Sequence, residues 1–482
     1  MKKRHYFTWA VCALGLGVGP NSFAAQVNDL FQPALTLPTH LQAQGIASGD
    51  VNGDGRTDVV VSGCGCGPNI SSELYVFLGQ PDGSLSNAPI TYLTHGSGSV
   101  AIGDVTGDIR KDVVLVAPHG IEVYPQDNNG NLGAPIFYST NYYNFHRLGD
   151  LNNDGRLDVF GLTDSINGID NTADGGVLYQ TGSGTFASPV TVAAPHGVND
   201  DVELADVNGD GRTDVVVMNG YTAQPNISVL YQAANGALAA PVLINIGQNQ
   251  IAHALGVGDI NNDGRRDIVV SYGGYYSDAH LAIFRQNADG SFAAPESLST
   301  LDAVGPIEVA DLNNDGRNDI VILHQSSIGA LLQNSNGTLA AEDNSLAVTS
   351  YVSHFQMGMV LDDINGDGLT DIAFAHIPGA LMVRYGKPQN ALPVATADSV
   401  TTACNTTTTI PVLKNDLDPD GDALTIVAVS APSNGVATIV NEGKKIRYNP
   451  KNTFHGKDQF TYTISDGHGG FATALVTVTV NN

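Results

Sequence analysis

Short apolar runs separated by turn residues dominate the chain between residues 45 and 385. The β-branched runs at residues 59–61, 215–217 and 320–322 are too short for helices and have the composition of buried strands. Further strands follow, such as residues 74–78 and 281–284, and Gly-containing turns such as Asp82-Gly83 separate them. Four short strands in each stretch of roughly 50 residues are typical of a propeller blade. The pattern therefore predicts an all-β fold.

A nine-residue loop, Asp-x-Asn-x-Asp-Gly-x-x-Asp, precedes each of these β-branched runs. The first copy contains Asp50, Asn52, Asp54, Gly55 and Asp58. The later copies begin at Asp104, Asp150, Asp206, Asp259, Asp311 and Asp363, so that the step varies between 46 and 56 residues. A period of this size marks a repeat architecture. Seven copies predict a seven-bladed β-propeller, which we place at residues 26–388.

The seventh repeat lacks its last strand, because only two residues separate Pro388 from the strand at residues 381–385. The missing sequence is found near the N-terminus, where residues 31–39 resemble residues 292–300 at the end of the fifth repeat. We therefore expect residues near 31–39 to form the outer strand of the last blade. Such closure leaves only short, protected strand edges.

The composition changes after Pro388. Residues 389–394 are interpreted as a linker, and residues 395–482 are rich in Thr and Val. Residues 472–480 alternate between polar and apolar side chains, as a half-buried strand does. This segment is predicted to be a small Ig-like β-sandwich.

The repeated loop offers oxygen ligands at regular spacing. Side chains at offsets 0, +2, +4 and +8 and the backbone carbonyl at +6 match the six to eight oxygens that Ca²⁺ takes, and Gly at +5 permits a sharp turn. Mg²⁺ prefers a stricter octahedron, and Zn²⁺ prefers His or Cys. The alternative is a turn that uses its side chains only locally. Seven phased copies favour several structural Ca²⁺ ions.

The predicted metal ligands follow the loops in order. They are Asp50, Asn52, Asp54, Arg56, Asp58; Asp104, Thr106, Asp108, Asp112; Asp150, Asn152, Asp154, Arg156, Asp158; Asp206, Asn208, Asp210, Arg212, Asp214; Asp259, Asn261, Asp263, Arg265, Asp267; Asp311, Asn313, Asp315, Arg317, Asp319; and Asp363, Asn365, Asp367, Leu369, Asp371. Arg and Leu take part through their carbonyls. The second loop has Ile109 where Gly is expected. Since a β-branched residue resists positive φ, we expect this site to be weak or empty.

The net charge supports cation binding. The chain has 48 Asp and Glu against 21 Lys and Arg, a net charge of −27. Three aspartates in each of seven loops account for 21 of those acidic residues. This balance argues against nucleic acid or an anionic membrane as a partner.

The N-terminus is typical of a secretory signal peptide, predicted at residues 1–25. Lys2, Lys3 and Arg4 precede an apolar run at residues 6–18, and small residues offer cleavage after Ala24 or Ala25. We expect a bacterial protein that is secreted or lies at the cell surface, without membrane insertion. Cys64 and Cys66 form either a small local disulfide or two free thiols, and Cys404 is expected to be a small buried hydrophobic residue.

The loops and strands together resemble FG-GAP/VCBS repeats, the family that builds the seven-bladed head of integrin α subunits. The motif Gly-Asp-x-Asn-x-Asp-Gly-Arg-x-Asp carries the resemblance over residues 30–390. It implies that Ca²⁺ braces the turn between the two inner strands, on the face opposite the usual ligand surface. The C-terminal segment is similar to cadherin-like bacterial Ig domains, which act as spacers. That resemblance implies Ca²⁺ ligands at Asp418, Asp420, Asp422 and Asp466.

A second set of residues is predicted to lie on the ligand face. Histidines precede the inner strands of several repeats, with His146 and His253 closer to the loop than the others, and a His ring at the channel mouth is one interpretation. Polar residues at exposed turns are the alternative. The candidates are His40, His95, His196, His253, His354, Tyr142, Tyr143, Tyr221, Tyr275 and Tyr276. Tyr272 belongs to the same group of aromatic side chains, which suit protein or sugar contacts.

Motifs for catalysis are absent from the sequence. It contains no Gly-x-Ser-x-Gly elbow, no phosphate loop and no His-Glu-x-x-His. We therefore expect a non-enzymatic, monomeric adhesion module that binds a protein or carbohydrate partner. The alternatives are a lectin with repeated sugar sites and a secreted enzyme that acts on polysaccharide or lipid at the channel mouth.

Overall fold

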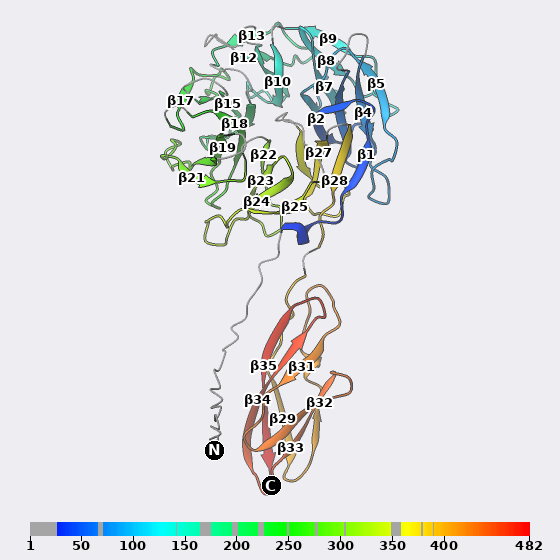
Figure 1. The fold of residues 1–482 in the computed structure, drawn as a ribbon, viewed down its shortest axis with the longest axis vertical. Coiled ribbons are helices and arrows are strands. Elements are labelled where there is room, and N and C mark those ends of the chain that lie inside the picture. The colour runs from blue at the N-terminus through cyan, green and yellow to red at the C-terminus, as the bar shows by residue number, and fades with distance from the viewer. Residues whose placement is uncertain are drawn as a thin grey trace, which may run out of the picture. The chain divides into compact units, whose positions relative to one another are not determined.

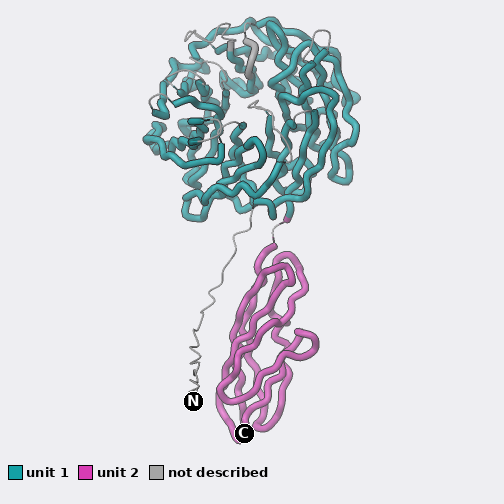
Figure 2. The backbone as a smooth tube through the Cα atoms, in the orientation of Figure 1, with its two compact units in different colours: residues 1–387 teal, residues 388–482 magenta. Residues whose placement is uncertain are grey.

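The structure is a computed structural model of the 482-residue chain. It describes residues 27–65, 71–140, 142–163, 175–194, 201–219, 226–247, 250–274, 278–302, 305–348, 358–376, 379–388 and 390–482. The predicted signal peptide lies outside these residues. The chain forms two compact units, residues 1–387 and 388–482 (Figure 2). Within the described ranges, no helix has the length and apolar character needed to cross a membrane.

The first unit contains seven four-stranded antiparallel sheets, the blades, which stand round a common centre (Figure 1). Blades 1 to 3 comprise β2 (Gln42–Gly49), β3 (Asp58–Cys64), β4 (Ser72–Phe77) and β5 (Ile90–Thr94); β6 (Val100–Gly103), β7 (Asp112–Ala117), β8 (Gly120–Tyr124) and β9 (Ile136–Ser139); and β10 (Tyr142–Gly149), β11 (Asp158–Thr163), β12 (Gly175–Leu178) and β13 (Val190–Val192).

The next three blades repeat this order. They comprise β14 (Asp201–Ala205), β15 (Asp214–Met218), β16 (Ile227–Leu230) and β17 (Val242–Ile244); β18 (Ala252–Gly258), β19 (Asp267–Gly273), β20 (Ala279–Phe284) and β21 (Glu296–Ser299); and β22 (Ile307–Ala310), β23 (Asp319–Leu323), β24 (Ser327–Leu331) and β25 (Asp343–Ala347). The unit is a seven-bladed propeller, as the repeated loops predict.

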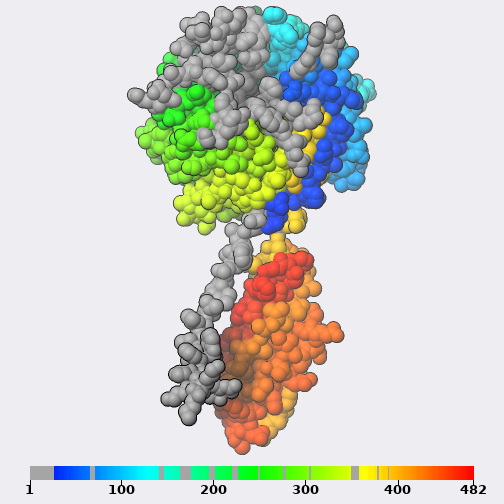
Figure 3. All heavy atoms as spheres, in the orientation of Figure 1, coloured from blue at the N-terminus to red at the C-terminus, as the bar shows by residue number. Residues whose placement is uncertain are grey.

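Blade 7 combines the two ends of the first unit. Its strands are β26 (Met359–Asp362), β27 (Asp371–His376), β28 (Ala380–Arg384) and, from the N-terminal side, β1 (Leu35–Pro38). Leu35 lies opposite Val383 and Pro38 opposite Ala380, and a bridge from Phe31 to Gly386 extends the pairing. Blue N-terminal residues accordingly lie against yellow residues of blade 7 in Figure 3. A short 3₁₀ helix, η1 (Val27–Leu30), precedes β1.

The apolar core of the propeller is divided among the seven junctions between neighbouring blades. Val59 and Val61 face the cluster shared with blade 7, whereas Val60 between them faces the cluster shared with blade 2. The second strand of each blade is therefore buried on both faces. This explains why the residues after each loop form continuous β-branched runs and do not alternate with polar side chains.

The second unit is a β-sandwich. One sheet has the order β29 (Asp398–Ala403), β35 (Phe471–Asn481), β34 (Gly456–Ser465) and β31 (Thr425–Val429), and the other has β30 (Thr408–Ile410), β33 (Lys445–Pro450) and β32 (Gly435–Val440). A 3₁₀ helix, η2 (Val412–Lys414), follows β30. Val394, which the sequence places in the linker, is already bridged to Leu417. The sandwich core includes Tyr448 and Tyr462, and Cys404 packs beside it as a half-buried free thiol.

Candidate functional site

Each repeated loop, called an acidic loop below and numbered with its blade, joins the first and second strands of that blade. The first aspartate is held at the centre of its loop by backbone N–H groups. In acidic loop 1, Gly53 donates to Asp50 Oδ1 at 2.6 Å and Gly55 donates to Asp50 Oδ2 at 2.8 Å. Asn52 Oδ1 accepts the N–H of Asp54 at 2.9 Å. The loop thus folds its backbone round the carboxylate that a cation would contact.

The last aspartate of each acidic loop is fully buried at the start of the second strand. Asp58 Oδ2 accepts the N–H of Val51 at 2.9 Å, and Oδ1 accepts that of Gly79, beyond the third strand, at 2.8 Å. One carboxylate therefore ties three segments of the blade together. Burial raises the pKa of Asp58 to about 6, against the two hydrogen bonds that lower it. Burial likewise raises the pKa to about 6 for Asp158, Asp214, Asp319 and Asp371.

An arginine at offset +6 clamps the loop, a role that the sequence analysis missed because it assigned only the backbone carbonyl there. Arg212 Nε donates to the carbonyl of Gln232 at 2.8 Å, and its guanidinium pairs with Asp210. Five other loops repeat this arrangement, whereas acidic loop 7 has Leu369. The recurrence of Arg after Gly was the signal available in the sequence.

Neighbouring blades meet at the acidic loops. Gln232 of blade 4 donates from Nε2 to the carbonyl of Asp150 in acidic loop 3, at 3.0 Å. The hairpin glycine Gly236 of blade 4 packs against the same loop, and a Cβ added there would lie 2.5 Å from the Asn152 carbonyl oxygen. Gln180 and Gln333 bind acidic loops 2 and 5 in the same way. Each such loop is thus both a turn and part of a junction between blades.

One side-chain oxygen at offset +2, Asn152 Oδ1 in acidic loop 3, is buried without a partner. An oxygen left in this way is suited to a cation, because calcium binds carbonyl and carboxylate oxygens. The donor set therefore fits a hard divalent ion.

Acidic loop 2 keeps the common geometry despite its substitution. Ile109 adopts a φ of 71° with 93% of its surface exposed, and its N–H still donates to Asp104 Oδ2 at 2.8 Å. The backbone at Ile109 is therefore strained, since L-residues disfavour the left-handed region of positive φ. Weak cation binding at this loop stays a prediction.

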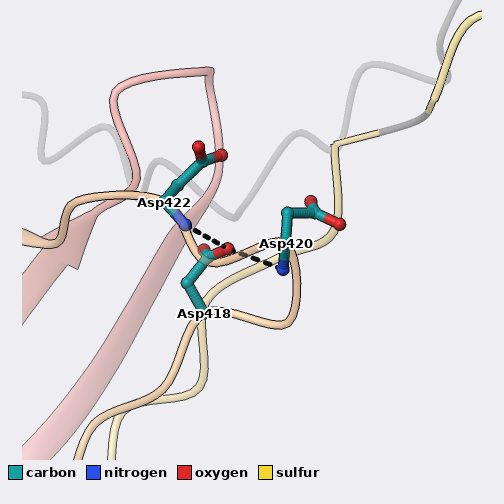
Figure 4. Close-up of side chains that lie close together, drawn as sticks. All are labelled: Asp418, Asp420 and Asp422. Carbon is teal, nitrogen blue, oxygen red and sulfur yellow. Dashed lines mark hydrogen bonds between the residues drawn. The ribbon is translucent and has the colours of Figure 1, made fainter.

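The second unit brings together three of its four predicted ligands. Carboxylate oxygens of Asp418, Asp420 and Asp422 all lie within 4.8 Å of one another (Figure 4). Asp418 is 6% exposed; its Oδ1 accepts the N–H groups of Asp420 and Asp422, while its Oδ2 is buried without a partner. This orphaned carboxylate oxygen fits a cation that Asp420 and Asp422 would also bind.

Asp466 does not belong to that group of three. Its Oδ2 accepts a hydrogen bond from Asn390 Nδ2 at 2.7 Å, and its Oδ1 accepts the N–H groups of His468 and Gly470. Asp420 Oδ2 accepts the N–H of Ala391 at 2.5 Å. Both aspartates thus hold the segment that enters the second unit.

The described ligand-face candidates lie in different environments. The prediction that His253 lies on the ligand face is wrong. His253 lies inside β18 with a buried ring that bonds to the Gly273 carbonyl at 2.9 Å, and burial lowers its pKa. His146, inside β10, is buried in the same manner and its pKa falls to about 3. His40 is exposed and contacts Tyr75. Tyr272 stacks on His280.

The remaining candidates are described only in part. His196, His354, Tyr221, Tyr275 and Tyr276 lie outside the described residues. Tyr142 and Tyr143 belong to β10. Cys64 is disulfide-bonded, and Cys66 is outside the described residues.

Among the described residues, cavities open between neighbouring blades, and the following two are the most relevant to binding. The first, about 810 Å³, lies between blades 1 and 2 and contains His95, Glu122 and Phe137. The second, about 710 Å³, lies between blades 4 and 5 and is lined by apolar side chains such as Val242, Leu243 and Phe292. In the first cavity, His95 Nδ1 contacts Glu122 Oε1 at 2.5 Å.

A buried histidine between two carboxylates joins blades 5 and 6. His324 Nδ1 lies 2.9 Å from Asp302 Oδ1, and Nε2 lies 2.6 Å from Glu342 Oε1. Burial alone would lower the pKa of His324, but the two carboxylates outweigh it and raise the pKa to about 9. Because His324 is fully buried, this group holds the junction together and offers no surface to a ligand.

The inner strands carry another charged group. Arg147 on β10 lies 2.7 Å from Glu203 Oε1 and 3.6 Å from Asp201 Oδ1, both on β14. Burial raises the pKa of Asp201 to about 7 and that of Glu308, on β22, to about 8. These groups were not found from the sequence, because the residues come from three repeats and share no motif.

Comparison with known proteins agrees with the repeat structure. FG-GAP-like repeats match at residues 50–115, 104–161, 150–217, 206–270, 259–322 and 311–374, which together include all seven acidic loops. A bacterial Ig domain matches at residues 390–479. No curated protein sequence matches the chain.

Two solved structures are similar at low sequence identity. One is a lectin of Agrocybe aegerita that recognises non-reducing terminal N-acetylglucosamine (TM-score 0.46, 19% identity, 63% of this chain and 81% of the lectin). The other is the V. cholerae biofilm matrix protein Bap1 (TM-score 0.39, 13% identity, 72% of this chain and 88% of Bap1). On the repeat matches, which span more than half of its length, the chain belongs to the FG-GAP-repeat proteins and carries a bacterial Ig domain after its repeats.

Proposed function

We propose that this protein is a calcium-stabilised propeller that binds a carbohydrate or protein partner outside the cell, with the Ig domain as a spacer. The observation that carries the proposal is that the predicted calcium ligands all lie at one end of the blades. The acidic loops lie at the end where the first strand meets the second, and the connections between blades lie at the other end. Calcium at the loops would be structural and would leave the other end open to a partner.

The acidic loops support the calcium part of the proposal through their donor chemistry. Asn152 Oδ1 and Asp418 Oδ2 are buried without partners, one in each unit. A bound Ca²⁺ would supply the missing interaction and offset the negative charge of the surrounding aspartates. The residues that would hold it in the propeller are those at offsets 0, +2, +4 and +8 of each loop.

Export is supported by the cysteine chemistry. Cys64 is disulfide-bonded, and disulfides persist in oxidising compartments such as the periplasm and the extracellular space. This agrees with the signal peptide that the N-terminal sequence predicts.

Binding is favoured over catalysis by the surroundings of the histidines. The His324 group, the most strongly charged arrangement of this kind among the described residues, is buried away from any substrate. His95 is exposed but is paired with Glu122, and no nucleophile is hydrogen-bonded to its ring within the described residues. General-base activation of a nucleophile requires that contact.

A matched pair of variants tests the calcium claim. Asn208 Oδ1 accepts the N–H of Asp210 at 2.9 Å, whereas Asn152 Oδ1 has no partner. Asn208→Ala should therefore lower the melting temperature both in EDTA and in excess Ca²⁺, because it removes a protein hydrogen bond in either case. Asn152→Ala should lower it only in Ca²⁺. An equal loss for Asn152→Ala in both buffers would contradict calcium binding at acidic loop 3.

A further inference from the structure

We propose that the cavity between blades 1 and 2 is a binding site for a neutral saccharide of one or two rings, a proposal that rests on the proposed binding function. The lining comes from both blades: Gly65, Ser71 and Ser72 from blade 1, and Pro118, Glu122 and Phe137 from blade 2. Its volume of about 810 Å³ is in the range of small-molecule sites. Most of these residues lie towards the end of the blades away from the acidic loops.

One wall of the cavity is an aromatic surface. Phe137 on β9 is 50% exposed, although exposure of a phenylalanine side chain to water is energetically unfavourable. Pro118 and Pro135 also line this cavity and are apolar. A pyranose ring has an apolar C–H face of similar size, so it can cover the phenyl ring while its hydroxyl groups point elsewhere.

The polar side of the cavity is formed by the His95 imidazole, which Glu122 holds in one orientation. Glu122 is 2% exposed, and its two oxygens bind His95 Nδ1 at 2.5 Å and the Tyr124 hydroxyl at 3.0 Å. The His95 side chain is 83% exposed, and no hydrogen bond of its Nε2 occurs within the described residues. A buried carboxylate that holds Nδ1 orients the ring and leaves Nε2 to exchange a hydrogen bond with a ligand hydroxyl.

The charge of the lining selects against ionic ligands. Among the described lining residues there is no Lys or Arg that would bind a phosphate or carboxylate group. The one carboxylate among them, Glu122, is already bonded to His95 and Tyr124. Ser71 and Ser72 add hydroxyl groups beside Gly65, next to the disulfide-bonded Cys64. An aromatic wall with uncharged hydrogen-bonding groups fits a neutral sugar better than an anion.

Binding to the full chain is measured by calorimetric titration with cellobiose, lactose, chitobiose and maltose, in excess Ca²⁺. Phe137→Ala and His95→Ala should each weaken the Kd of the sugar that binds by at least about tenfold. Leu243→Ala is the matched control, because Leu243 is also the second residue of an outer strand, is also 50% exposed, and lines the other cavity. It should leave the Kd unchanged.

The outcomes of this titration distinguish an error in the proposed site from an error in the proposed binding function. If the wild type binds a sugar and both Phe137→Ala and His95→Ala keep its affinity, the site is wrong while the binding function stands. If Leu243→Ala alone abolishes binding, the sugar lies between blades 4 and 5 and this proposal is overturned. If the wild type binds none of the four sugars, or hydrolyses one, the saccharide-binding proposal fails, and a protein partner or an enzyme becomes the better explanation.

Discussion

The two ends of the propeller blades differ in how far their chemistry repeats. At one end, every acidic loop buries its last aspartate, and backbone N–H groups surround its first aspartate. At the other end, neighbouring blades are joined by unlike groups. His95 and Glu122 lie between blades 1 and 2, whereas Asp302, His324 and Glu342 lie between blades 5 and 6.

This difference indicates which end is scaffold and which end can be specific. An arrangement present in every blade meets a need that every blade has, namely to fix its first turn and to contact the next blade. A group that occurs at one junction is not required by the repeat. It is therefore free to hold that junction or to recognise a ligand. Each of the following predictions tests one side of this contrast.

Removal of Ca²⁺ should give the largest effect, because it acts on all the acidic loops at once. A loop filled at about 100 times its Kd gains about 2.7 kcal/mol of stability from the ion. Chelation by EDTA should therefore lower the melting temperature of the propeller steeply in differential scanning calorimetry. Excess Mg²⁺ should restore little, since it prefers a stricter octahedral shell. If the melting temperature of the propeller is the same with and without EDTA, calcium does not stabilise the scaffold.

The junction at His324 should show a pH dependence of its own. Its folded-state pKa of about 9 lies above the ordinary value of 6.5, so the charged histidine stabilises the fold fully below pH 6.5. This stability, up to about 3 kcal/mol, is lost as pH rises through about 9. His324→Gln should therefore unfold more easily than the wild type at pH 6 and approach it at pH 10, as urea titrations in excess Ca²⁺ would measure.

His146 provides the control, because its shift has the opposite sign. Its folded-state pKa of about 3 lies below the ordinary value, so the neutral ring contributes stability above pH 6.5 that is lost as pH falls towards 3. His146→Gln should accordingly show no loss of its effect between pH 7 and 10. If both variants respond alike to alkaline pH, the ion pairs of His324 do not hold the junction.

The sequence predicts the repeated end well because each feature there is local. Asp50 and Asp58 are close along the chain, and their spacing alone places both in the same loop, while their role as calcium ligands stays a prediction. The closing strand near Leu35 was predictable as well, because it resembles the end of the fifth repeat. Arg212 was assigned only its carbonyl, since its bond to the Gln232 carbonyl joins the loop to a turn 20 residues away.

The varied end could not be predicted because its contacts cross between repeats. Glu122 lies 27 residues from His95 and in another blade, and neither residue has a counterpart at the same position in each repeat. The expectation of a His ring failed for His253 for a similar reason. A shift of a few residues placed its ring inside β18 instead of in the connection before it. Sequence spacing alone does not reveal this change of environment.

Contacts between blades at the acidic loops should contribute about 2 kcal/mol each where a glutamine makes them. Gln232→Ala removes the bonds of Nε2 to the Asp150 and Thr213 carbonyls and leaves buried acceptors without donors. Gln126 is the matched control, because it occupies the same position in blade 2 but its Nε2 has no partner. Urea titration should show the larger loss for Gln232→Ala. Equal losses would mean that packing, not the hydrogen bonds, connects the blades.

The smallest effect is expected at acidic loop 2, the one acidic loop without Gly at offset +5. Ile109→Gly removes the strain of an L-residue at positive φ, worth about 1 to 2 kcal/mol, but increases the entropy of the unfolded chain. The net gain should be about 0.5 to 1 kcal/mol in EDTA, measured by thermal unfolding. Ile109→Ala keeps a Cβ and should gain little. If strain is what weakens this site, Ile109→Gly should gain further stability when Ca²⁺ is added, and Ile109→Ala should not. If Ca²⁺ stabilises the two variants equally, strain at Ile109 does not weaken cation binding. Acidic loop 2 then differs from the other loops in sequence only, because the repeated backbone geometry sets its cation binding whatever residue stands at offset +5.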